Sequence, residues 1–133
     1  MITAKAVMTP WILTATKNMP VLQALDIMLQ HWISGLPVVD DDKNVIGIIT
    51  EKDLLELYDK TMHIKDMTVK DIMTTDVVCF DEGDSLDDVC TCLMKNDFRR
   101  VPVLSNGKLV GIISRPDITR GILEKIKRDS QRF

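Results

Sequence analysis

Two short stretches of the sequence combine a hydroxyl side chain with a carboxylate three residues later. Thr50 precedes Asp53, and Ser114 precedes Asp117, each directly after an apolar run. If a helix begins at the hydroxyl residue, its first turn offers unpaired N–H groups and the positive end of the helix dipole, which favour an anion. Each carboxylate also offers two acceptor oxygens, which match the two donors of a ribose cis-diol. The alternative is a capping box, in which the same spacing only begins a helix.

Arginine side chains lie close in sequence to the second of these stretches. Arg99 and Arg100 precede an apolar run, and Arg115 directly follows Ser114. The planar guanidinium fork suits phosphate oxygens, so this half of the chain is predicted to contact a phosphate group. The alternative is a solvated basic rim that pairs with Asp97 or with other acids.

The first half of the chain supplies fewer cations to its own stretch. It has Ser34 and Gly35 where the second half has the two adjacent arginines, and Lys52 is its local cation. We therefore expect the site that contains Ser114 and Asp117 to bind an anionic ligand more tightly than the first site.

Both stretches belong to a pattern that occurs twice, at an offset of 64 or 65 residues. Each repeat is predicted to run strand, helix, strand, strand, helix, which makes a mixed α/β (α+β) fold with repeats at 1–64 and 65–133. Units of about 60 residues are marginal alone, so we expect the two to pack about a pseudo-twofold axis and share one core. The matching segments are 7–9 with 72–74, 36–39 with 101–104, and 47–53 with 111–117.

Local signals predict the elements of each repeat. The three aspartates at 40–42 fit a solvated hairpin turn better than a calcium loop, because no Gly and Glu follow at the required spacing. In the second repeat, Asn106-Gly107 predicts a tight hairpin turn. The expected elements of the first repeat are a strand at 12–15, a helix from Pro20 to about His31, strands at 36–39 and 45–49, a helix after Thr50 and a polar linker at 60–68.

Composition narrows the class of protein. Hydrophobic residues make up 45% of the 133 residues and charged residues 28%, and the formal net charge is -3. This charge favours neither nucleic acid nor an anionic membrane as a partner. No apolar run has the length of a membrane span, and no signal peptide is recognisable, so we expect a cytoplasmic protein. Its three cysteines form no disulfide framework, and no catalytic triad or metal-ligand cluster can be argued.

The two copies together resemble tandem CBS domains, the cystathionine β-synthase-type repeats that form a Bateman module. The resemblance rests on Leu36-Pro37-Val38-Val39 and Val101-Pro102-Val103-Leu104, and on the two Gly-Ile-Ile-Ser/Thr-x-x-Asp segments that end at Asp53 and Asp117. It implies a regulatory module, not an enzyme, that binds AMP, ADP or ATP in clefts between the repeats and signals to a partner protein. It also implies a homodimer, and no cofactor other than the ligand.

The resemblance implies roles for particular residues in nucleotide binding. The two aspartates would hold the ribose hydroxyls, and the basic pair would contact phosphate. Gly47 and Gly111 would let a ligand or a neighbouring backbone approach closely. Thr14 and Cys79 lie at equivalent positions where the family lines its base pocket, with a core role as the alternative. The expected set is Thr14, Pro37, Gly47, Thr50, Lys52, Asp53, Cys79, Arg99, Arg100, Pro102, Gly111, Ser114, Arg115 and Asp117.

Other functions compete with nucleotide sensing. One is a structural dimerisation module that keeps the fold without a ligand. Another is a sensor of S-adenosylmethionine, a family ligand without phosphates, against which the arginine pair argues. A third is an enzyme fragment, such as an insert of an inosine monophosphate dehydrogenase. We expect no enzyme, because the two repeats account for the whole sequence.

Overall fold

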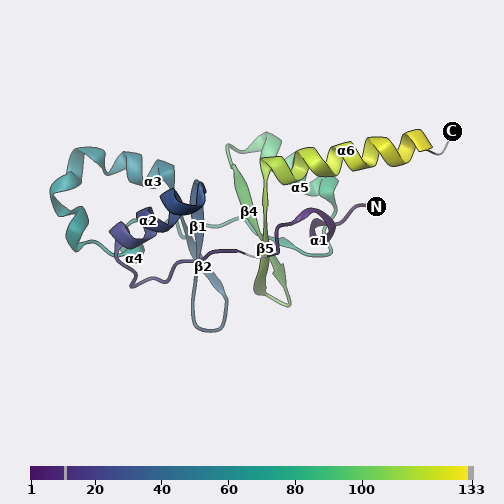
Figure 1. Ribbon diagram of the computed structural model, residues 1–133. Helices are drawn as coiled ribbons and strands as arrows, with labels where there is room; N and C mark the ends of the chain where they lie inside the picture. The colour runs from purple at the N-terminus through teal and green to yellow at the C-terminus, as the bar shows by residue number, and fades with distance from the viewer. Residues whose placement is uncertain (11, 132–133) are drawn as a thin grey trace. The chain divides into compact units, whose positions relative to one another are not determined.

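The computed structural model describes residues 1–10 and 12–131, except for the side chains of 59–62. It has the mixed α+β architecture predicted from the repeats (Figure 1). In chain order the elements are α1 (Ala4–Val7), α2 (Val21–His31), β1 (Gly35–Val39), β2 (Val45–Thr50), α3 (Glu51–Glu56), the 3-10 helix η1 (Tyr58–Asp66), α4 (Val69–Ile72), β3 (Phe80–Asp81), α5 (Leu86–Lys95), β4 (Arg100–Ser105), β5 (Lys108–Ser114) and α6 (Arg115–Gln131).

The chain divides into two compact units, which we name after the carboxylate that each contains. The Asp53 unit comprises residues 13–77, and the Asp117 unit comprises the described residues of 1–12 and 78–133. The first segment of repeat 1, the described residues of 1–12, therefore lies in the Asp117 unit, and the first segment of repeat 2, residues 65–77, lies in the Asp53 unit. The repeat boundaries at 64 and 65, the pseudo-twofold axis and the shared core stay predictions.

The Asp53 unit is built on the antiparallel hairpin of β1 and β2, in which Val38 lies opposite Gly47. The strand expected at 12–15 is reduced to a single parallel bridge, because only Ala15 bonds to β1, through its N–H to Pro37 and its carbonyl to Val39. Most of the linker expected at 60–68 is the helix η1, which at nine residues is longer than a usual 3-10 helix. The core of this unit is Ala15, Ala24, Met28, Leu36, Val38, Ile49 and Val69.

The turn between β1 and β2 is held by one of its aspartates. The Asp40 carboxylate accepts hydrogen bonds from the N–H of Asp42 at 2.9 Å and from the N–H of Asn44 at 2.9 Å. It also accepts from the Asn44 side-chain amide at 3.0 Å. The prediction of a hairpin turn at 40–44 is confirmed, since Asp40 closes the turn itself.

The Asp117 unit is built on a three-stranded sheet of order β3-β4-β5, parallel between β3 and β4 and antiparallel between β4 and β5. Asn106 and Gly107 connect β4 to β5 with φ values of 51° and 79°, so the predicted tight hairpin is confirmed. The long helix α6 follows β5 and packs against α1 and α5 (Figure 1). The core of this unit is Ala4, Val7, Leu86, Val89, Val101, Val103 and Ile113.

Candidate functional site

The Asp53 carboxylate caps the helix on which it lies. Where β2 runs into α3, the N–H and the hydroxyl of Thr50 donate to Asp53 Oδ2 at 2.8 and 3.0 Å. The N–H of Asp53 donates back to Thr50 Oγ1 at 3.4 Å, which completes a capping box. The capping box is therefore formed here, and it occupies one of the two carboxylate oxygens.

The Asp117 carboxylate repeats this arrangement at the start of α6. The N–H and hydroxyl of Ser114 donate to Asp117 Oδ2 at 2.8 and 2.9 Å. The two carboxylates differ in burial, because Asp117 is only 2% exposed whereas Asp53 is half-buried. In both units the second oxygen, Oδ1, points away from the cap and takes other partners.

In each unit, a threonine from the first segment of the other repeat donates to Oδ1. Thr74 Oγ1 lies 3.2 Å from Asp53 Oδ1, and Thr9 Oγ1 lies 3.1 Å from Asp117 Oδ1. Sequence reasoning identified the repeated segments 7–9 and 72–74 but did not assign either threonine to the site. Their signal is the Met-Thr pair that recurs at the repeat offset.

Backbone bonds fix both threonines against the strand that carries the motif. Thr74 exchanges two hydrogen bonds of 2.9 Å with Ile48 of β2. Thr9 exchanges bonds of 2.8 and 3.1 Å with Ile112 of β5. Each threonine hydroxyl is therefore delivered by a backbone that is itself held in register.

The motif glycines make room for these segments. A Cβ on Gly47 would lie 2.6 Å from Met73 Sδ and 3.0 Å from the Thr74 carbonyl oxygen. A Cβ on Gly111 would lie 2.9 Å from Met8 Cγ and 3.1 Å from the Thr9 carbonyl oxygen. The glycines were expected to allow the close approach of a ligand or of a neighbouring backbone, and the structure shows the neighbouring backbone. The Met-Thr segment thus contacts both the glycine and the aspartate of the motif.

Arg120 distinguishes the two carboxylates. Its guanidinium forms an ion pair with Asp117 Oδ1, and its side chain is 65% exposed. With this bond the Asp117 oxygens accept from four donors, whereas in the described part of the chain those of Asp53 accept from three. The residue equivalent to Arg120 in the first repeat is Glu56. Sequence reasoning missed Arg120, although its position three residues after Asp117 on a helix is a known pairing distance.

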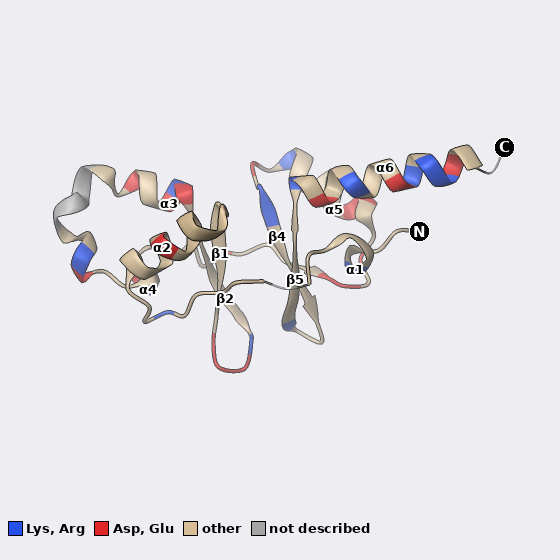
Figure 2. Ribbon diagram, in the orientation of Figure 1, with Lys and Arg blue, Asp and Glu red and all other residues tan. Residues whose placement is uncertain are grey.

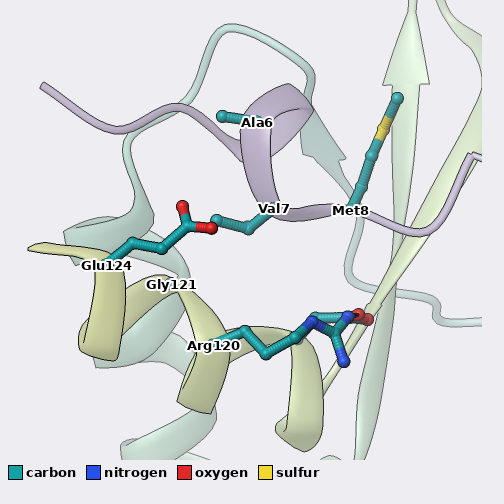
Figure 3. A pocket seen from close by; sticks show the side chains of 7 residues that line it. Ala6, Val7, Met8, Arg120, Gly121 and Glu124 are labelled. Atoms are coloured by element: carbon teal, nitrogen blue, oxygen red, sulfur yellow. Dashed lines mark hydrogen bonds and ion pairs between the residues drawn. The ribbon is translucent and has the colours of Figure 1, made fainter.

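A hollow of about 180 Å³ lies beside this ion pair in the Asp117 unit. Figure 3 shows Arg120 and Glu124 extending from α6 on the side that faces the segment Ala6–Met8. The lining therefore carries charges of both signs. Its residues are Ala6, Val7, Met8, Asp117, Arg120, Gly121 and Glu124.

The other expected basic residues occupy the start of β4, α3 and the start of α6 (Figure 2). Arg100 is half-buried and lies opposite Ser114 in the β4–β5 register, while Arg99 and Lys52 are exposed. Arg115 pairs with Asp97 at 3.6 Å, and both side chains are largely exposed. For Arg115 the structure therefore shows the solvated ion pair that was the alternative to phosphate contact.

The remaining expected residues lie in or next to strands. Pro37 and Pro102 are buried in β1 and β4, at equivalent positions of the two hairpins. Thr14 and Cys79 are half-buried, one before the Ala15 bridge and the other before β3. Burial raises the pKa of the Cys79 thiol above its ordinary value.

The described residues contain neither a metal-site cluster nor a membrane-spanning helix. In residues 1–10 and 12–131, no group of three or more His, Cys, Asp or Glu side chains has the arrangement of a metal site. In the same part of the chain, no helix combines the length and apolar character needed to cross a membrane. The three cysteines form no disulfide with one another.

A family model described as "CBS domain" matches the chain twice, at residues 4–60 and 69–124. The chain spans only part of the length of the curated relatives it matches: 41%, 21% and 65% of three of them. One is the inosine-5'-monophosphate dehydrogenase of Methanocaldococcus jannaschii, 36% identical over 82% of this chain but over only 21% of the enzyme. That match therefore gives no indication of a catalytic domain.

Two solved structures resemble the whole fold. CBSX2 in complex with AMP has a TM-score of 0.82 and 26% identity, covering 93% of this chain and 98% of that chain. CBSX2 comes from Arabidopsis thaliana. The CBS domain pair of protein MJ0100, in complex with 5'-methylthioadenosine and S-adenosyl-L-methionine, has a TM-score of 0.82 and 28% identity, covering 94% and 98%.

Proposed function

Because this chain belongs to the CBS domain family and carries two CBS domains in tandem, we propose that it is a regulatory module that binds AMP, ADP or ATP and signals to a partner protein. The observation that carries the proposal is the duplicated aspartate, held by the protein in the same way in both units. The AMP complex of the similar protein CBSX2 supports an adenine nucleotide as the ligand. Binding in clefts between the two repeats is part of the proposal.

Asp53 retains capacity for a ribose hydroxyl. A carboxylate has about four acceptor positions, and the described donors to Asp53 fill three of them. The remaining position is on Oδ1, which faces away from the cap. A ribose hydroxyl therefore binds Asp53 without displacing a protein donor.

For a ribose hydroxyl to bind Asp117, one of the present hydrogen-bond donors to this carboxylate has to leave. Its four acceptor positions are filled by Ser114, Thr9 and Arg120. Arg120 is the donor whose side chain is mostly exposed, so it is the one that a ribose hydroxyl displaces. The displaced guanidinium then becomes available to a phosphate oxygen, which suits a nucleotide better than a nucleoside.

Calorimetry with AMP, adenosine and S-adenosylmethionine tests the proposal. We expect AMP to bind most tightly, and Asp53→Asn to weaken AMP about tenfold through the loss of a charge-assisted hydrogen bond. Asp41→Asn, which changes an exposed turn aspartate in the same unit, is the matched control. Tighter binding of S-adenosylmethionine would favour the sensor alternative. No heat and no thermal shift with any of these ligands would favour a structural dimerisation module.

We propose a homodimer as the working assembly, supported by exposed apolar side chains on the Asp53 unit. Leu29 is 75% exposed, Trp32 95%, Leu55 74% and Tyr58 74%. Side chains of this size are enriched at the buried centres of interfaces. Light scattering at micromolar concentration tests the assembly, and a Trp32→Ser variant is expected to shift it toward the monomer.

A further inference from the structure

We propose that Thr9 and Thr74 are positioning residues for the ligand-binding carboxylates. Each comes from the first segment of one repeat and orients the aspartate of the other repeat's motif. This inference rests on the proposed function, since it concerns how the ribose of the nucleotide is held.

The hydrogen bond from the threonine fixes the terminal torsion of the aspartate side chain, which the capping box alone does not restrict. The terminal torsion of an aspartate side chain has broad energy wells. Hydrogen bonds from Thr50 hold only Oδ2 of Asp53. The bond from Thr74 at 3.2 Å holds Oδ1, so both oxygens are anchored and the plane of the carboxylate is set. That plane decides where the remaining acceptor position on Oδ1 points.

A capping role alone does not need this contact. The capping box uses Oδ2 and the Thr50 hydroxyl, and it is complete without Thr74. The same extra bond nevertheless occurs in both units, with the same backbone bridge and the same close approach to the motif glycine. In both units a hydroxyl thus donates to the carboxylate oxygen that the capping box does not use.

Removal of the threonine hydroxyl is expected to have a larger effect in one unit than in the other. In the described part of the chain, Thr74 is the one donor to Asp53 Oδ1. Asp117 Oδ1 has a second donor, the guanidinium of Arg120. Removing the hydroxyl should therefore disturb the Asp53 carboxylate more than the Asp117 carboxylate.

The experiment compares AMP with 2'-deoxy-AMP in calorimetric titrations of the full chain. Thr74→Val keeps the shape of the side chain and removes the hydroxyl, while Thr74→Ser keeps the hydroxyl. We expect Thr74→Val to weaken AMP about fivefold to tenfold and to reduce the preference for AMP over 2'-deoxy-AMP, because the deoxy ligand lacks one of the two diol donors. Thr74→Ser should retain both the wild-type affinity for AMP and the wild-type preference for AMP over 2'-deoxy-AMP. The smaller effect is expected for Thr9→Val.

Controls separate positioning from folding. Thr75→Val makes the same change at the next residue, which is also exposed, and should leave the preference unaltered. If Thr74→Val does not fold, Thr9→Val and Thr74→Ser carry the comparison, with Thr9→Val still expected to lower the preference. Unchanged AMP affinity and unchanged preference in both valine variants would overturn the assignment while leaving the proposed function intact. A wild-type protein that binds no adenine nucleotide would overturn both.

Discussion

Replacing Arg120 by methionine is expected to change stability and ligand affinity in opposite directions. Arg120 donates to a carboxylate that is 2% exposed, so its loss removes a charged partner from a buried group. A hydrogen bond to a charged group is worth about 1.5–3 kcal/mol. Because the Arg120 side chain is 65% exposed, solvent screening reduces its contribution to about 1 kcal/mol. This corresponds to a decrease of about 4 °C in melting temperature for a domain of this size.

The same substitution opens an acceptor position on Asp117 Oδ1. A ribose hydroxyl then binds without displacing the arginine, which favours adenosine by the same amount of about 1 kcal/mol, or about fivefold in affinity. AMP should gain less, because the variant also lacks the guanidinium that the phosphate would attract. The Arg120–Asp117 ion pair thus stabilises the protein but weakens the binding of adenosine, which has no phosphate.

The assay is calorimetry with adenosine and AMP in an Asp53→Asn background, so that the Asp117 unit reports alone. Arg128→Met, on an exposed position of the same helix, is the matched control. Thermal unfolding is measured on the same samples. The reasoning is refuted if Arg120→Met lowers the melting temperature but leaves adenosine affinity unchanged or weaker.

Further substitutions test the packing around the motifs. Gly47→Ala should destabilise the protein by about 1–3 kcal/mol in urea unfolding, because the added Cβ meets Met73 and the Thr74 carbonyl; an unchanged midpoint would contradict this packing. Asp40→Ala should cost about 1 kcal/mol in the same assay through loss of its turn bonds, with AMP affinity unaltered. Burial raises the pKa of the Cys79 and Cys90 thiols, and Asp87 adds to the effect at Cys90. Both therefore hold less thiolate at pH 8 than an ordinary thiol, and peptide mapping should show iodoacetamide alkylation slower than that of glutathione.

The turns and helix caps that depend only on neighbouring residues could be predicted from the sequence. The Asn106-Gly107 turn follows from two residues that accept positive φ, and the caps at Thr50 and Ser114 follow from side chains three residues apart. The repeat order was equally readable, because both copies keep the same residue types at one offset.

The missed features depend on contacts between distant parts of the chain. The Thr9 hydroxyl donates to Asp117, which lies 108 residues later in the sequence. No pattern within either segment predicts this pair. The strand expected at 12–15 has suitable residues, yet only Ala15 bonds to β1. Arg120 is the exception, because its ion pair with Asp117 spans only three residues of α6, whereas the predicted cations of the site were those directly before β4 and after Ser114.

The exchange of first segments between the two repeats joins parts of the chain that are far apart in sequence. Thr9 is made well before Ile112, its bridge partner from a distant part of the sequence. Contacts of such high sequence separation slow folding, because the intervening loop must close before they form. A fragment that starts at residue 65 would leave Ile112 without its bridge and Gly111 uncovered. Such a fragment is expected to borrow the missing strand from another molecule, as in domain swapping.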